Sequence, residues 1–352
     1  VNAVEGDPGF VNPINDFNLR NGSPAINAGE DLGQTKDIRN NPINGNPDIG
    51  AYENRLNEIE QVSKPTYFVS SSLGSDSNSG TSENFPWQTL AKVEVESSGF
   101  TSGTTIGFRG GDEFYGNLSF TGLTGGADSP VTFTSYGTGK GMISGRKAIT
   151  GWSNTGGNIW TASTSGDTVY QAFRGDNSMQ NGRFPTFNGV GYDSANYAVI
   201  TSVSDSQNTF SASGLTSTLG DFDLVGATVF VKPNSFRLEG NNITSYDYTT
   251  GTITFSPNIG TYGLAIGQEF FITNAEHLLF EQDNWYHSGN TLFMYSIREP
   301  KNIFGTTIDS DGVLLYQCSY VDVDNLAIQY FNVAGINVDS YSDNVNVVNN
   351  TI

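Results

Sequence analysis

The sequence of 352 residues has few of the residue types on which several kinds of functional site depend. A single cysteine, Cys318, excludes an intrachain disulfide framework. The two histidines, His277 and His287, lack a companion Cys/His cluster and an HExxH pattern, which argues against a zinc site. No GxSxG or GxxxxGK(S/T) pattern occurs, so serine-hydrolase and P-loop chemistry have no support.

Long apolar runs and basic residues are also scarce. No apolar run approaches about 18 residues, so the sequence predicts no helix that spans a membrane. Lys+Arg number 16 against 36 Asp+Glu, a formal net charge of −20. A chain this acidic repels nucleic acid and anionic membranes, so neither is an expected partner. The simplest explanation of the charge is the solubility of a long exposed surface.

The residues that are abundant favour short strands. Glycine numbers 42 and aromatic residues make up 12% of the chain, while charged residues make up 15%. Together with many Ser, Thr and Asn residues, this composition suits strands joined by turns and is poor in helix formers. The chain is longer than a typical single domain, so we expect more than one structural unit.

Apolar residues recur at a spacing of about two dozen residues in two parts of the chain, residues 106–143 and residues 321–352. The matching pairs are Ile106 and Val131, Phe108 and Phe133, Leu118 and Ile143, Val321 and Val345, Val323 and Val347, and Ile328 and Ile352. Three short strands and three turns occupy about that length, so the spacing predicts one turn of a parallel β-helix. Asn325 and Asn349 fall in the same register, which suggests an amide ladder at a turn.

The repeat divides the chain into five segments. Residues 67–153 hold the first turns, and 297–352 hold further turns. Between them, residues 154–296 break the period but remain rich in strand-like runs, so we expect an inserted β-rich subdomain. Residues 1–53 are rich in turns, and residues 54–66 form a polar linker.

Four stretches resemble a known family. "DPGFVNP…DFNLRNGSPAINAG…DIGAYE" resembles the last turns and cap of secreted bacterial right-handed β-helix proteins. "YFVSSSLGSDSNSGTSENFPWQTL" resembles the opening strand, loop and capping helix of the pectate-lyase-like superfamily, and "GTTIGFRGGDEFYGNLSF" its first turns. "FFITNAEHLLFEQDNWYHSGNTLFMYS" is similar to the insertion of carbohydrate-active β-helix proteins, including some glycoside hydrolases.

This resemblance implies an all-β fold: a right-handed parallel β-helix with an inserted β-rich subdomain, preceded by the C-terminal end of another β-helix in residues 1–53. It also implies a polypeptide that continues into further domains at both ends. An extracellular or cell-surface location on a Gram-negative bacterium is typical of such repeats.

Two functions follow from the resemblance. The first is a non-enzymatic surface module, an adhesin or a structural rod, that faces a polysaccharide or cell-surface glycan, and two successive β-helices favour it. The alternative is a polysaccharide-degrading enzyme, a glycoside hydrolase or lyase, whose catalytic turns lie mostly beyond residue 352. The insertion favours this alternative.

Glycan-cleaving β-helices usually carry paired carboxylates or a carboxylate-bound Ca²⁺ on their outer wall. Asp322 and Asp324 flank Val323, so both side chains should point outward from one strand. With Asp339, they are the candidate catalytic residues. The other interpretation is that they are solvated wall residues between inward valines.

Asp309 and Asp311 lie in "DSDG", which resembles part of a Ca²⁺ loop, although the ligand pattern that should follow is absent. They are the candidate metal ligands, and Ca²⁺ is the cofactor that they suggest. A turn is the simpler interpretation of this sequence.

Three residues are candidates for carbohydrate binding. Trp285 and Tyr286 can stack on a sugar ring, or they can pack in the core of the insertion. Asn284 stands where related insertions often carry an acidic residue, which removes support for an acid–base role of this motif. Arg183 in "GRFP" is either a buried tie or a ligand for a carboxylate.

Overall fold

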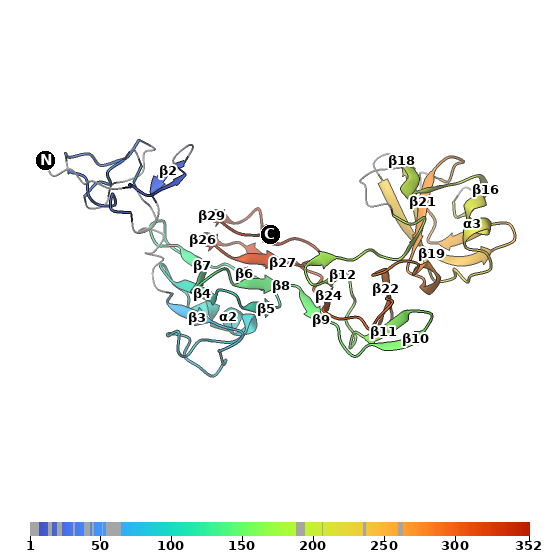
Figure 1. Ribbon diagram of the computed structural model, residues 1–352, viewed down its shortest axis with the longest axis horizontal. Helices are drawn as coiled ribbons and strands as arrows, with labels where there is room; N and C mark the ends of the chain where they lie inside the picture. Colours follow the sequence, from blue (N-terminus) through green and yellow to red (C-terminus); the bar gives the residue numbers. More distant parts are fainter. Residues whose placement is uncertain are drawn as a thin grey trace.

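The structure is a computed structural model that describes residues 7–12, 16–19, 23–30, 32–38, 43, 46–50, 52–53, 65–187, 194–205, 207–234, 237–259 and 263–352. Within these ranges the fold is all-β, as expected, with a few short helical segments (Figure 1). The helical segments are α2 (Leu90–Glu96), α3 (Ser213–Thr218), η1 (Ser97–Gly99), η2 (Ser194–Asn196) and η4 (Glu276–Leu278). None of the described helices has the length and apolar character needed to cross a membrane.

Three sheets made of parallel strand pairs form what we call the parallel body, residues 67–144 and 313–351. Their strands are β3 (Tyr67–Val69), β4 (Thr105–Arg109), β5 (Glu113–Tyr115), β6 (Leu118–Thr121), β7 (Val131–Tyr136), β8 (Met142–Ser144), β25 (Val313–Tyr316), β26 (Ser319–Asp324), β27 (Ala327–Gln329), β28 (Ile336–Val338) and β29 (Asp343–Val348). The sheet orders are β3-β4-β7-β26-β29, β5-β8-β27 and β6-β25-β28. Consecutive strands therefore visit the three sheets in turn.

The predicted repeat near the end of the chain is confirmed. Val321 pairs in parallel with Val345, and Val323 pairs with Val347. Asn349 also follows its strand as Asn325 does, and both have left-handed backbones, with φ of 55° and 54°. The Asn349 amide donates to Asp324 of the preceding turn at 2.9 Å, so its bond goes to a carboxylate and not along an amide ladder.

The pairs predicted in the first turns are wrong. Ile106 pairs with Phe133, two residues beyond the expected Val131, because the connection between β6 and β7 is longer than an even period allows. Leu118 pairs with Val313 and not with Ile143. The chain leaves the body after β8 and returns at β25, so the equivalent of β6 in the next turn lies far along the sequence.

The inward side chains of the parallel body form one continuous core. On β26 the alternation puts Val321 and Val323 at 0% exposure and leaves their neighbours half-buried. Phe120 and Phe133 stack in this core with ring centroids 4.8 Å apart. Helix α2 covers one end, as the sequence predicted, and its Leu90 belongs to the same core.

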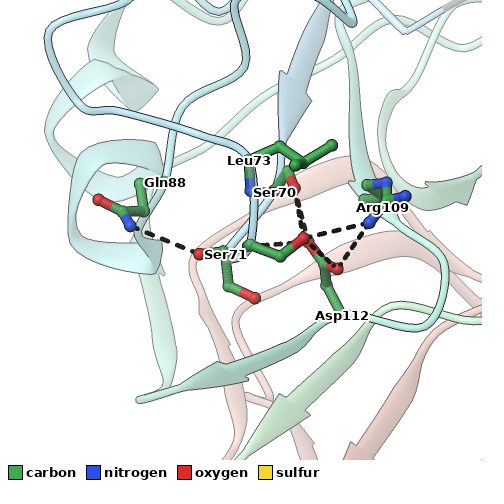
Figure 2. Close-up of polar contacts among 7 residues, drawn as sticks. Ser70, Ser71, Leu73, Gln88, Arg109 and Asp112 are labelled. Atoms are coloured by element: carbon green, nitrogen blue, oxygen red, sulfur yellow. Dashed lines mark hydrogen bonds and ion pairs between the residues drawn. The ribbon is translucent and has the colours of Figure 1, made fainter.

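A buried carboxylate fastens the loop after β3 to the body (Figure 2). Asp112 accepts hydrogen bonds from Ser70 Oγ at 2.6 Å and from Ser72 Oγ at 2.8 Å. Arg109 Nη1 donates to the same carboxylate at 3.1 Å. Burial raises the pKa of Asp112, but these hydrogen bonds outweigh it and hold the pKa below its ordinary value. The loop is therefore tied by a charged group.

The antiparallel region, residues 146–306, interrupts the parallel body. It contains two four-stranded sheets, β10-β11-β23-β22 and β13-β12-β24-β9, and an eight-stranded sheet that we call the eight-stranded module, residues 183–273. Its strands are β9 (Arg146–Ala148), β10 (Ser153–Gly156), β11 (Ile159–Ser163), β12 (Gln171–Arg174), β13 (Asn177–Ser178), β14 (Arg183–Phe184), β15 (Ala198–Val199), β16 (Ser202–Asp205), β17 (Thr209–Ser211), β18 (Thr228–Asn234), β19 (Arg237–Asp247), β20 (Thr252–Ser256), β21 (Glu269–Thr273), β22 (Trp285–Ser288), β23 (Thr291–Tyr295) and β24 (Ile303–Thr306).

This region is wider than the expected insertion of residues 154–296. Strand β9 pairs antiparallel with β24, and both lie outside that range. In Figure 1 the two four-stranded sheets lie next to the parallel body and the eight-stranded module lies beyond them.

The N-terminal segment contains a small hairpin of β1 (Phe10–Asn12) and β2 (Asp16–Leu19). The Asp48 carboxylate accepts a hydrogen bond from the backbone N–H of Asn27 at 2.7 Å. This bond ties the segment around Asp48 to the turn before it. That this segment ends a preceding β-helix stays a prediction. The expected linker, 54–66, lies outside the described residues except for its last two positions.

Candidate functional site

Four aspartates, two on β26 of the parallel body and two in the connection that leads into β25, each accept a hydrogen bond from an asparagine further along the chain. The pairs are Asp309 with Asn332 at 2.7 Å, Asp311 with Asn337 at 2.9 Å, Asp322 with Asn346 at 2.8 Å and Asp324 with Asn349 at 2.9 Å. Equivalent positions of neighbouring parallel strands lie about 4.8 Å apart, so aspartate stacked on aspartate would bring like charges together. Asn346 is the register partner of Asp322, and it replaces that repulsion with a hydrogen bond.

Asp322 and Asp324 point outward from β26, as predicted, because the valines on either side of Asp322 are fully buried. The Cα atoms of residues two apart on a strand are about 6.6 Å apart, and their side chains lie on the same face. Asp339 is separate from this pair: it lies in the turn after β28, where its carboxylate accepts from the Tyr341 amide at 3.0 Å. The structure therefore brings together two of the three candidate catalytic carboxylates.

Asp309 and Asp311 lie in the connection that leads into β25. Asp309 also bonds the Tyr170 hydroxyl, and this hydrogen bond raises the pKa of Tyr170. One oxygen of Asp311, Oδ1, is buried without a hydrogen-bond partner. Among the described residues no group of three or more His, Cys, Asp or Glu side chains could hold a metal ion. Calcium binding by this pair stays a prediction.

Trp285 and Tyr286 are packed inside the antiparallel region. The Trp285 side chain is 3% exposed, and its indole nitrogen donates to the Met179 carbonyl at 3.1 Å. Tyr286 stacks on Phe293 with ring centroids 4.5 Å apart, and burial raises its pKa to about 12. Asn284 accepts hydrogen bonds from the backbone of the turn before β22. The core-packing interpretation describes both rings.

Arg183 is a half-buried tie within the eight-stranded module. Its Nε donates to the Pro185 carbonyl at 3.0 Å, and a second nitrogen donates to the Asn196 carbonyl. The guanidinium lies 4.0 Å from the centroid of the Phe271 ring. Burial lowers the pKa of Arg183. These backbone and ring contacts account for the residue without a carboxylate ligand.

A pocket of about 440 Å³ lies between the small sheets and the eight-stranded module. Phe230 and Phe271 line it from β18 and β21, and Trp285 and His287 line it from β22. His287 Nε2 lies 3.2 Å from Thr164 Oγ1, and burial lowers the pKa of His287. The sequence analysis missed this pocket. The local signal for it in the sequence is an aromatic residue, Phe230 on β18 and Phe271 on β21, on the face of the strand that points away from the core.

Comparison with known proteins points to glycoside hydrolases. A scan against protein-family models found no match. A stretch of 73 residues, 20% of this chain, is 42% identical to a lacto-N-biosidase of Bifidobacterium longum subsp. longum and covers 5% of that protein. A solved glycoside hydrolase matches 75% of this chain with a TM-score of 0.59 and 18% identity, which shows a similar fold.

A solved GH136 lacto-N-biosidase from Eubacterium ramulus aligns over 78% of this chain and 22% of its own, with 14% identity. Its TM-score of 0.26 is too low to support an argument. The chain spans half the length of the solved glycoside hydrolase and a small part of the curated relative.

Proposed function

We propose that this chain is part of a secreted glycoside hydrolase whose parallel body is a right-handed β-helix. The observation that carries the proposal is the stretch that is 42% identical to a lacto-N-biosidase. The fold shared with a solved glycoside hydrolase supports it. So does the order of the strands, because consecutive strands visit three parallel sheets in turn, as in a β-helix.

An enzyme therefore has more support than the surface adhesin or structural rod, which the sequence alone favoured. The relatives carry the names of glycan hydrolases, and the glycan itself is the expected partner in either case. The secreted location and the further domains at both ends remain part of the proposal.

The geometry that suits hydrolysis best is the pair Asp322 and Asp324. Inverting glycosidases hold two carboxyl groups about 6.5–9.5 Å apart, which leaves room for a water molecule. In this proposal one carboxylic acid protonates the leaving oxygen, while the other carboxylate removes a proton from the attacking water. The hydrogen bonds from Asn346 and Asn349 hold the two carboxylates in place.

The test is glycan hydrolysis by the native polypeptide that contains this chain. Neutral oligosaccharides are incubated with the wild type and with Asp322→Asn and Asp324→Asn, and the newly formed reducing ends are measured. We expect each substitution to reduce the rate at least about 100-fold. Asp343→Asn, exposed at the start of β29, is the matched control and should keep the wild-type rate.

Full activity in both variants would remove the pair from the mechanism. An absence of hydrolysis by the wild type on every oligosaccharide, with the fold intact, would contradict the enzyme and return the surface-module interpretation.

A further inference from the structure

The aromatic wall of the pocket comes from the second face of the eight-stranded sheet. On β18, Val229 and Val231 are at 0% exposure in the core of the module, so Phe230 between them points to the opposite face. Phe271 on β21 is in direct register with Phe230, and their rings stack 4.8 Å apart at 13°. Two flat rings therefore face away from the core that holds the sheet.

Both rings are held by neighbours on their own face of the sheet. Gly240 is the register partner of Phe230 on β19, and a Cβ there would lie 2.5 Å from the Phe230 ring. The absence of a side chain at Gly240 thus lets the ring lie flat on the neighbouring strand. Phe271 has the Arg183 guanidinium 4.0 Å from its centroid. The wall keeps one shape, which lowers the entropy cost of binding.

Apart from Val169 and Trp285, the remaining lining is polar but uncharged. Asn181 and Asn274 supply amides, Tyr170 a phenol, and His287 an imidazole that burial keeps neutral at neutral pH, since it lowers the pKa of that ring. The Asn274 amide is oriented by its hydrogen bond to Thr228 Oγ1 at 3.1 Å. None of the described residues that line the pocket is Asp, Glu, Lys or Arg, although the chain carries a net charge of −20.

This combination of aromatic rings and uncharged polar groups favours one class of ligand. A charged ligand would lose hydration without meeting a counter-charge, and a purely apolar ligand would leave the amides unpaired. A sugar ring has apolar C–H faces for the aromatic wall and hydroxyl groups for the amides. A volume of about 440 Å³ lies in the range of small-molecule sites.

We propose that this pocket is a binding subsite for an uncharged mono- or disaccharide, separate from the aspartate pair of the parallel body. The proposal rests on the proposed function for the class of ligand, whereas the position and selectivity come from Phe230, Phe271 and the uncharged polar lining.

Isothermal titration calorimetry of the 352-residue chain tests it with lactose and N,N′-diacetylchitobiose as neutral probes and digalacturonate as a charged one. We expect binding of at least one neutral probe and none of digalacturonate. Phe230→Ala should weaken binding about tenfold or more. Phe230→Leu keeps most of the apolar volume and should still lose most of the affinity, because the ring that stacks on Phe271 and shapes the wall is gone.

Two further variants guard against a folding artefact. Gly240→Ala leaves the pocket lining unchanged but pushes the Phe230 ring out of position, so it should weaken binding as well. Phe222→Ala is the matched control: this ring lies in the same module, is 38% exposed and stacks on His277 outside the pocket. It should bind as the wild type does. Thermal unfolding is recorded for every variant.

The proposal is overturned if no neutral probe binds, if digalacturonate binds equally well, or if Phe230→Ala and Phe222→Ala bind alike. If the proposed enzymatic function is wrong, the hydrolysis and binding results differ from those just described. Neutral-sugar binding that depends on Phe230, without hydrolysis by the native polypeptide, supports the subsite and contradicts the enzyme. Hydrolysis that depends on Asp322, with binding unchanged in Phe230→Ala, supports the enzyme and contradicts the subsite.

Discussion

The parallel body and the eight-stranded module are built on opposite principles. In the body, residues such as Val321 pair with their equivalents one turn away, and one core runs through all the turns. In the module, antiparallel strands that all lie within residues 183–273 close around a separate core that includes Phe255. A stack of turns depends on each neighbouring turn, whereas the module contains all the partners it needs. The two should therefore be separate units of stability.

Arg146 lies at the junction between the parallel body and the four-stranded sheets of the antiparallel region. Arg146, on β9, has a side chain only 5% exposed and forms ion pairs with Glu113 at 3.3 Å and Asp176 at 3.0 Å. Its guanidinium lies 3.7 Å from the Tyr330 ring centroid and 4.5 Å from that of Phe304. Glu113 and Tyr330 belong to the body, while Asp176 and Phe304 belong to the antiparallel region. One charged group thus contacts both structures, next to other contacts such as the Phe173 and Tyr330 rings, whose centroids are 4.9 Å apart.

The largest expected effect comes from removing one buried ring from each of the two cores. Phe133→Ala in the body and Phe255→Ala in the module each remove a fully buried ring and should cost about 3–5 kcal/mol. Because the cores are separate, each loss should stay in its own unit. Hydrogen exchange should show faster opening of β4, β7 and β26 in the first variant, and of β17 to β20 in the second.

Faster exchange throughout the chain in both variants would contradict this separation. It would mean that the body and the module unfold as one cooperative unit.

The same contrast explains how much of the fold was predictable. The last turns repeat at even spacing with alternating apolar residues, so Val321 and Val345 could be paired from sequence alone. Leu118 could not, because its partner Val313 lies beyond the antiparallel region. Periodicity counts residues along the chain, and it fails where a connection is long or uneven.

The candidate site shows the same limit. The outward direction of Asp322 and Asp324 follows from strand alternation. The pocket does not, since Tyr170, Phe230 and His287 meet only through the pairing of distant antiparallel strands. The burial of Trp285 was equally undetermined: a Trp-Tyr pair on a strand suits a sugar platform and a core alike, and only the fold places its indole nitrogen against the Met179 carbonyl.

A smaller effect is expected at the junction. Arg146→Met keeps the length of the side chain but removes its charge and its five donors, at a cost of about 2–3 kcal/mol. Glu113 and Asp176 can take up water, since their side chains are 36% and 82% exposed, which keeps the cost at the lower end for a buried ion pair. Hydrogen exchange should increase at β9 and β24 while both cores keep their protection.

Lys147→Met is the control for the junction. It removes the next cation on the same strand, whose ion pair with Asp167 is about one-third exposed on each side, so it should change little. Equal effects of the two substitutions would show that the Arg146 contacts do not join the units.

The smallest effect concerns the loop tied by Asp112. Asp112→Asn keeps the shape of the side chain but replaces a charged acceptor of four hydrogen bonds, and it should cost about 1–2 kcal/mol at neutral pH. The folded-state pKa of Asp112 is lowered, so its contribution to stability is present above the unfolded pKa of about 3.9 and is lost as the pH falls through the folded value.

The difference in stability between wild type and Asp112→Asn should therefore be constant near neutral pH and should shrink below about pH 3.9. Urea unfolding across this range measures it, with Asp128→Asn, an exposed change in the loop between β6 and β7, as the control. A difference that stays unchanged into acid would assign the effect to the shape of the amide. Dependence on pH would instead show that a buried charge fixes the loop after β3 to the body.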